Sequence, residues 1–157
     1  MISQTAEYAL RALAHLVSQG DRKRVLSREI AAELGIPSNY LSKILHQLVR
    51  ARVLGSARGA RGGFQLACDP ASVPLLQIVN LFDGLATRRE CFLGQTICSD
   101  LDPCHVHERW KPVITAYLHF LEHTSLADMV RNESNAPAPG WRAVQMPGQQ
   151  TGKRLES

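Results

Sequence analysis

Three cysteines and His107 lie within 17 residues, in the spacing Cys91-x6-Cys98-x5-Cys104-x2-His107. The only other cysteine in the chain is Cys68. Thiolates are soft ligands that select zinc, copper(I) or the iron of an iron–sulfur cluster, and a neutral imidazole can complete such a site. The segment is therefore a candidate metal centre, and the rest of the chain must indicate what a metal would do there.

Several chemistries are open to these cysteines. Disulfides are disfavoured, because the thiols lie beside histidines and no export signal precedes them. A structural zinc ion accepts the same ligands, but its ligands usually lie two to four residues apart, whereas the gaps here are six and five. An oxidation switch would need a cysteine of low pKa and a resolving partner. The wide gaps favour an iron–sulfur cluster, with either two or four irons.

Positive charge is concentrated in the first part of the chain. Residues 1–70 contain 10 Lys and Arg against 5 Asp and Glu, whereas residues 71–157 contain 8 against 9. This imbalance predicts an anionic partner for the N-terminal part. No stretch reaches the roughly 20 apolar residues of a membrane helix, and Glu7 and Arg11 interrupt the segment where a signal peptide would be apolar. We therefore expect a cytoplasmic protein without a membrane partner.

The basic part of the chain has a helical pattern. Apolar residues recur at helical spacing over 3–19. A short helix is then predicted to begin at Ser27 and end at Gly35, and a second one to open at Pro37-Ser38-Asn39 and run to Arg50, joined by the turn Gly35-Ile36-Pro37. We expect Ser27 to cap the first of these, and Ser38 or Asn39 the second. Two short helices with a tight turn are typical of a DNA-binding helix-turn-helix. The polar face of the second helix carries side chains that can bond base edges and phosphates: Ser38, Asn39, Ser42, Lys43, His46, Gln47 and Arg50.

A glycine- and arginine-rich loop follows, between the short apolar segments Val53-Leu54 and Phe64-Gln65-Leu66. This pattern predicts a β-hairpin, which would be a wing after a helix-turn-helix. Arg58 and Arg61 are placed to enter a minor groove or to bind phosphates. No Walker lysine follows, which disfavours a nucleotide-binding loop. No nucleophile motif or paired carboxylates accompany the cysteines, so we do not expect an enzyme.

The second half of the chain predicts two further helices. One covers 75–82, and a longer one begins at His105 and has an apolar side from Val106 to Leu121, with the cysteine loop at 87–103 between them. A long apolar helix on a small protein needs a partner, so we expect a homodimer. A last short helix is expected at 124–130, capped by Thr124 or Ser125, and a disordered tail beyond 132.

These patterns predict a mainly α fold, a winged helix-turn-helix with a small β-hairpin wing and a long C-terminal dimerisation helix. The expected organisation is a DNA-binding domain at 1–70, a second unit at 71–131 and a tail at 132–157. The second unit would hold the linking helix, the cysteine loop and the dimerisation helix.

The same elements carry a family resemblance. The stretches TAEYALRAL (5–13), LSREIAAELGIPSNYLSKILHQL (26–48), ARGARGGFQLA (57–67) and CFLGQTICSDLDPCHVHERW (91–110) resemble the winged-helix iron–sulfur transcription regulators that include IscR, NsrR and RirA. The resemblance covers roughly residues 1–131. It implies a dimer that binds palindromic promoter DNA as a repressor or activator. It also implies sensing of cluster status, iron, nitric oxide or redox state, although some relatives carry no cluster.

Residue by residue, the resemblance implies that Cys91, Cys98 and Cys104 are the cluster thiolates. His107 matches the histidine that is the fourth ligand in the IscR type. Glu7 falls where other relatives supply a carboxylate from the partner subunit. We favour His107, with Glu7 as the alternative, and the sequence leaves open both the number of irons and whether the loaded or the empty form binds DNA.

Overall fold

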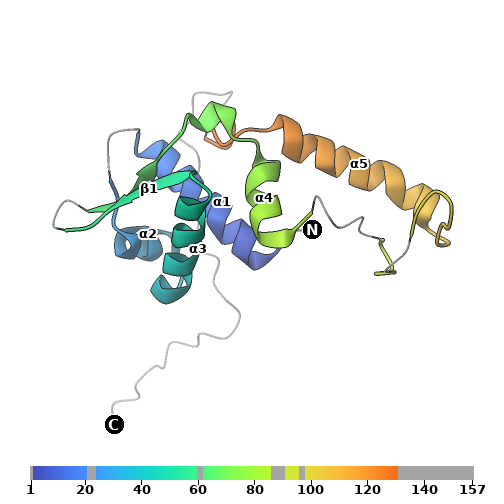
Figure 1. Ribbon diagram of the computed structural model, residues 1–157, viewed down its shortest axis with the longest axis horizontal. Coiled ribbons are helices and arrows are strands. Elements are labelled where there is room, and N and C mark those ends of the chain that lie inside the picture. The colour runs from blue at the N-terminus through green and yellow to red at the C-terminus, as the bar shows by residue number, and fades with distance from the viewer. Residues whose placement is uncertain (1, 21–23, 60–61, 86–90, 96–97, 131–157) are drawn as a thin grey trace, which may run out of the picture.

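The computed structural model describes residues 2–20, 24–59, 62–85, 91–95 and 98–130. In order, the elements are α1 (Gln4–Ser18), α2 (Ser27–Leu34), α3 (Ser38–Arg50), β1 (Leu54–Ala57), β2 (Gly63–Leu66), the 3-10 turn η1 (Pro70–Ser72), α4 (Leu75–Asp83) and α5 (His107–His123). The first three helices, the hairpin and α4 are grouped together, and α5 projects from this group (Figure 1). The predicted mainly α fold with a hairpin wing is confirmed.

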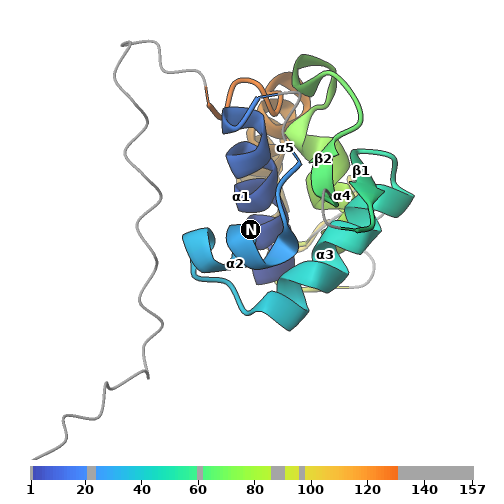
Figure 2. The same ribbon diagram turned by 90° about the vertical axis from the view of Figure 1, so that its left-hand side faces the viewer.

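The first helix is the centre of the core. Ser3 caps α1, because its Oγ accepts the backbone N–H of Ala6 at 3.1 Å. α1 packs against α2, α3 and α4, and Figure 2 shows these helices around it. The guanidinium of Arg11 is buried, and its Nη2 donates to the carbonyl of Leu34 at the end of α2 at 2.9 Å. Arg11 therefore ties α1 to the helix-turn-helix.

The helix-turn-helix lies where it was predicted, but the cap of its first helix differs. Leu26 is the N-cap of α2, and its backbone N–H donates to the carboxylate of Glu29 at 3.3 Å. Ser27 lies inside the helix, and its buried hydroxyl has no hydrogen-bond partner in the part of the chain that the structure describes. The predicted Ser27 cap is therefore wrong, because the carboxylate three residues later bonds the first free N–H instead.

The cap of the second helix differs as well. Pro37, whose φ is −56°, is the N-cap of α3, and no side chain caps this end. Ser38 and Asn39 lie in the first turn and are exposed, so neither is the predicted cap. The proline presets the backbone at the helix start, which leaves both polar side chains free to face outward.

The hairpin is antiparallel, with Leu54 opposite Leu66. Val25 extends the sheet by an isolated bridge, since its N–H and C=O each bond the backbone of Phe64 at 2.9 Å. Gly63 has a φ of +130°, and a Cβ at this position would lie 2.7 Å from the carbonyl oxygen of Val25. This glycine is therefore required for the close packing of β2 on Val25. The turn residues 60–61 lie outside the described ranges.

The core does not end at residue 70. Ile78 and Val79 of α4, Leu121 of α5 and Leu126 beyond it belong to the same buried cluster as the residues of α1 and α3. The division into units at 1–70 and 71–131 therefore stays a prediction. The tail predicted at 132–157 lies outside the described residues. None of the helices in the described ranges has the length and hydrophobicity of a membrane span.

The helix predicted at 124–130 is absent, and turns take its place. The backbone of this segment is hydrogen-bonded to an earlier part of the chain. The N–H of Leu126 donates to the carbonyl of Val73 at 3.0 Å, and the carbonyl of Thr124 accepts the N–H of Leu75 at 2.8 Å. The carboxylate of Asp128 accepts the N–H and the hydroxyl of Ser125 at 2.9 and 2.6 Å. The prediction was wrong because the backbone groups of Thr124 and Leu126 bond residues 73–75 and do not form the regular hydrogen bonds of a helix. The long helix begins at His107 rather than at His105.

Two leucine truncations test the position of the core. Leu45 in α3 is fully buried, whereas Leu101 is 98% exposed. Leu45→Ala should lower the free energy of unfolding by about 2–5 kcal/mol, because it leaves a cavity. Leu101→Ala should change it by less than about 0.5 kcal/mol. Denaturant titration followed by circular dichroism measures both, and equal effects would show that α3 is not packed in the core as described.

Candidate metal centre and nucleic-acid interface

The cysteine loop is held by local turns at the start of α5. The backbone N–H of Gly94, whose φ is +72°, donates to the carbonyl of Cys91 at 2.9 Å. Ser99 and Asp102 exchange two backbone hydrogen bonds of 3.2 Å, and the N–H of His107 donates to the carbonyl of Cys104 at 3.0 Å. These turns bring the sulfurs of Cys91, Cys98 and Cys104 close together, although the residues are separated along the chain.

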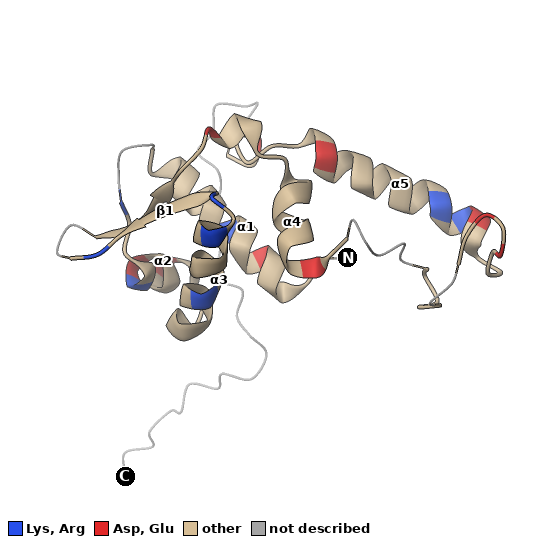
Figure 3. Ribbon diagram, in the orientation of Figure 1, with Lys and Arg blue, Asp and Glu red and all other residues tan. Residues whose placement is uncertain are grey.

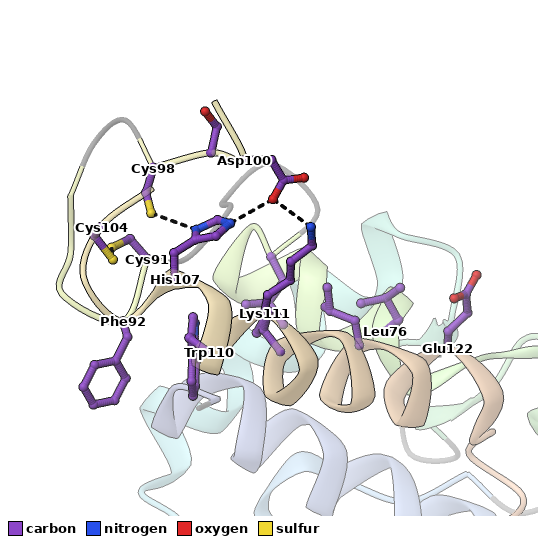
Figure 4. A pocket seen from close by; sticks show the side chains of 14 residues that line it. Leu76, Cys91, Phe92, Cys98, Asp100, Cys104, His107, Trp110, Lys111 and Glu122 are labelled. Carbon is purple, nitrogen blue, oxygen red and sulfur yellow. Dashed lines mark hydrogen bonds and ion pairs between the residues drawn. The ribbon is translucent and has the colours of Figure 1, made fainter. Parts of the chain in front are cut away.

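The donor atoms form two close pairs (Figure 4). The sulfurs of Cys91 and Cys104 lie 3.6 Å apart, and the sulfur of Cys98 lies 3.1 Å from Nδ1 of His107. All three sulfurs are within 4.8 Å of one another. Two ligands of one tetrahedral metal with bonds of about 2.3 Å lie roughly 3.8 Å apart. The donor types and the pairing thus fit a thiolate-bound metal ion or cluster.

The histidine is oriented from its other side. Nε2 of His107 lies 2.9 Å from the carboxylate of Asp100, which also accepts from Nζ of Lys111 at 2.7 Å. The hydrogen bond from Lys111, followed by the one from His107, lowers the pKa of Asp100 to about 2. An ionised carboxylate on Nε2 favours the tautomer with Nδ1 unprotonated, which is the form that binds a metal. Asp100 is thus a partner that positions His107.

The thiols differ in acidity. The backbone N–H of Gln95 is the main reason that the pKa of Cys91 is lowered to about 7. The backbone N–H of Cys104 favours the thiolate of Cys98, but burial and the two neighbouring thiols outweigh it, so that the pKa of Cys98 is raised. Cys91 is therefore the more acidic of these two thiols.

A pocket of about 500 Å³ opens beside the cysteines and extends along α5 to α4. The three cysteines line it together with apolar residues, among them Leu76 of α4, Leu85 just beyond α4, and Ile114 and Leu118 of α5. Trp110, which the sequence places on an apolar side for dimerisation, also lines this pocket, and its ring lies 5.2 Å from that of Phe92.

The remaining cysteine and the alternative ligand lie elsewhere. The thiol of Cys68 lies 3.7 Å from the carbonyl of Val53, and burial raises its pKa. Glu7 lies on α1 with a half-exposed side chain, 3.7 Å from the guanidinium of Arg11. Neither side chain lines the cysteine pocket of its own chain.

Most of the predicted DNA-binding side chains in the described ranges are exposed. On α3, Ser38, Asn39, Lys43, His46, Gln47 and Arg50 are exposed, whereas Ser42 is half-buried. Arg58 is exposed in the hairpin, and Arg61 lies outside the described residues. Figure 3 shows the basic residues of α2, α3 and the hairpin in this part of the molecule, away from the cysteine loop.

Sequence reasoning missed three cations and one aromatic residue near this surface. Arg24, Arg28 and Arg52 are exposed, and the charge excess over 1–70 was the signal that could have found them. Arg52 has a φ of +60° at the turn between α3 and β1. The aromatic residue is Tyr40 at the start of α3, which is exposed and whose hydroxyl bonds the hydroxyl of Thr5.

A family model for Rrf2, described as an iron-dependent transcriptional regulator, matches residues 2–132. The chain belongs to the Rrf2 family. An HTH-type transcriptional regulator of Aquifex aeolicus is 35% identical over 135 residues, which cover 85% of this chain and 93% of the relative. NsrR of Shouchella clausii is 28% identical over 138 residues, covering 87% and 93%.

Solved Rrf2-like structures share the fold. CymR, the global cysteine regulator of B. subtilis, aligns with a TM-score of 0.69 at 23% identity over 82% of this chain and 95% of its own. IscR of T. potens aligns with a TM-score of 0.67 at 22% identity over 87% and 91%. This Rrf2 protein is a transcriptional regulator with a DNA-binding fold. Its relatives are regulators rather than enzymes, which agrees with the sequence-based prediction.

Cysteine substitutions test whether the converging thiols of this Rrf2 protein bind a metal. Cys91→Ala, Cys98→Ala and Cys104→Ala should each lower the metal content per chain to less than about a tenth, because three thiolates converge and no fourth lies near. The matched control is Cys68→Ala, which should retain the parent's content. Elemental analysis after anaerobic purification measures this. Metal loss in the Cys68 variant alone would overturn the ligand assignment.

Proposed function

We propose that the protein is a homodimeric regulator whose affinity for promoter DNA is controlled by an iron–sulfur cluster on Cys91, Cys98, Cys104 and His107. The observation that carries the proposal is the convergence of three thiols and one imidazole at the start of α5, in a chain whose other end is a basic winged helix. The cytoplasm is the compartment in which such a protein meets both DNA and reduced thiols.

The chemistry of the donor set supports a cluster. A cluster bound there would supply iron that responds to oxygen, nitric oxide or iron supply. Two close donor pairs, Cys91 with Cys104 and Cys98 with His107, suit two tetrahedral irons with two protein ligands each. Imidazole binds iron less tightly than thiolate, so His107 would be the weakest ligand. Asp100 and Lys111 would hold the imidazole in place.

A second candidate is a mononuclear zinc site or a thiol switch. The three sulfurs, all within 4.8 Å of one another, also suit three ligands of one tetrahedral ion. The 3.6 Å between Cys91 and Cys104 and the lowered pKa of Cys91 suit an oxidisable pair. Visible absorption and iron and sulfide analysis of anaerobically purified protein separate the candidates, because zinc protein and free thiols are colourless.

The dimer is proposed from the surface of α5. Val113 and Phe120 are 52% and 54% exposed, and Phe92 on the cysteine loop is 64% exposed. Large apolar side chains in one region mark an interaction surface. A second copy of the chain is the natural partner, because two winged helices related by a two-fold axis match a palindromic site.

DNA binding by this surface should be strongly salt dependent. Each phosphate contact contributes a slope of about −0.9 to the plot of log affinity against log salt concentration. Arg58→Ala should weaken binding and reduce the magnitude of the slope by about 1 per half-site. Arg109→Ala, an exposed arginine on α5, is the matched control and should leave both unchanged. Fluorescence anisotropy with a selected duplex measures the slopes, and identical slopes would exclude the wing from the interface.

The fourth ligand is tested by two substitutions. His107→Ala should perturb the cluster spectrum and lower the iron per chain, because it removes the donor next to Cys98. Glu7→Ala should leave the spectrum near that of the parent. Anaerobic absorption spectroscopy and iron analysis compare the two. A native spectrum in the His107 variant together with an altered spectrum in the Glu7 variant would assign the ligand to the partner subunit instead.

A further inference from the structure

We propose that α4 is a link with two hydrogen-bonded joints, which couples the cysteine site to the recognition helix α3, and that Asp83 is its positioning residue. The inference rests on the proposed function, since it explains how a change at the cysteines reaches the DNA-binding surface. It assigns this coupling to particular bonds at the two ends of α4.

The need for a link follows from the distance along α5. His107 is the first residue of α5, and Leu121, near its end, is buried in the core. A helix of 17 residues is about 25 Å long. The cysteine loop therefore lies at the outer end of α5, while the core and α3 lie toward the other end (Figure 1). A change at His107 reaches the core as a tilt or shift of this helix.

The first joint connects the end of α5 to the start of α4. The carbonyl of Thr124 accepts the N–H of Leu75, the first residue of α4, at 2.8 Å. The N–H of Leu126 donates to the carbonyl of Val73 at 3.0 Å. Leu121 and Leu75 are both buried in the core. The start of α4 must therefore follow a movement of the last turn of α5.

The second joint connects the end of α4 to the start of α1. The carboxylate of Asp83 accepts the N–H of Ser3 at 2.8 Å and also accepts the hydroxyl of Ser3. The same hydroxyl oxygen caps α1 through Ala6. The carboxylate also lies at the N-terminus of α1, where negative charge interacts favourably with the helix dipole. Asp83 therefore fixes the first turn of α1, and Figure 1 shows the end of α4 close to the start of α1.

The last step runs from α1 to α3. Oγ1 of Thr5 lies 2.5 Å from the hydroxyl of Tyr40, and the rings of Tyr8 and Tyr40 meet edge to face with centroids 5.9 Å apart. Tyr40 lies in the first turn of α3, next to Asn39 and Ser38, which are proposed to contact DNA. A movement of the start of α1 is thus transmitted to the part of α3 that would enter the groove.

The experiment measures DNA affinity in two states of each variant. The probe is a duplex selected from a random-sequence pool by the parent protein, and its dissociation constant is measured with iron-loaded and with chelator-stripped protein. In the parent the two constants should differ by about 5- to 150-fold, the usual range of coupling between sites. In Asp83→Asn the difference should fall below about threefold, with the iron content and absorption spectrum unchanged. The asparagine keeps the size of the side chain but loses one of the two acceptor oxygens and the charge.

Two further variants complete the test. Thr5→Val removes the partner of Tyr40 without altering the Ser3 cap, and it should reduce the difference similarly; it also serves if Asp83→Asn does not fold. Combining the two should cause no further loss, because both break one path. The control is Asp69→Asn, which replaces another capping carboxylate, bonded to the N–H of Ala71 at 3.0 Å, and it should behave as the parent.

The outcomes separate the two claims. Equal constants for loaded and stripped parent protein would overturn the proposed function and this inference together. A parent-like difference in Asp83→Asn and in Thr5→Val, both with normal iron content, would overturn the link through α4 and leave the proposed function standing.

Discussion

The packing of α4 between α1 and α5 is the constraint on which the arrangement of the two candidate sites depends. Ile78 and Val79 of α4 are fully buried and share one apolar cluster with α1, α3 and the end of α5. Burial of this kind contributes about 25 cal/mol for each Å² of apolar surface removed from water. Because the cluster is continuous, α5 is not an independent arm. Its inner end is part of the core, and its outer end carries the cysteine loop.

The two ends of the molecule differ in charge, and each suits a different binding partner. The described residues of α3 and the hairpin carry cations and no carboxylates, so that they attract a polyanion, whereas α2 carries two glutamates beside Arg28. At the other end, three thiols within 4.8 Å cannot all ionise without a cation, because like charges at this distance repel. The start of α5 favours negative charge there through the helix dipole. The donor set at this end therefore suits a metal, and the cationic surface at the other end suits DNA.

The sequence predicted the parts that depend on local patterns. The helix-turn-helix, the hairpin and the linking helix follow from apolar periodicity, glycine and proline, and the convergence of Cys91, Cys98 and Cys104 followed from their spacing. The bonds that couple the elements could not be predicted in this way. Ser3 and Asp83 are 80 residues apart, and Val25 meets Phe64 across the whole helix-turn-helix. The turn at 124–130 has helix-forming residues, but its backbone bonds residues 73–75 instead.

If α4 couples the two sites, a change at the cysteines alters the structure or stability of α1 and α3. Amide hydrogen exchange of the DNA-free protein, compared between iron-loaded and chelator-stripped samples, tests it most directly. We expect removal of iron to change the protection of amides from exchange at the cysteine loop, at the first turn of α1 (4–8) and at the first turn of α3 (38–42). Changes confined to residues 91–110, with unaltered protection in α1 and α3, would contradict it.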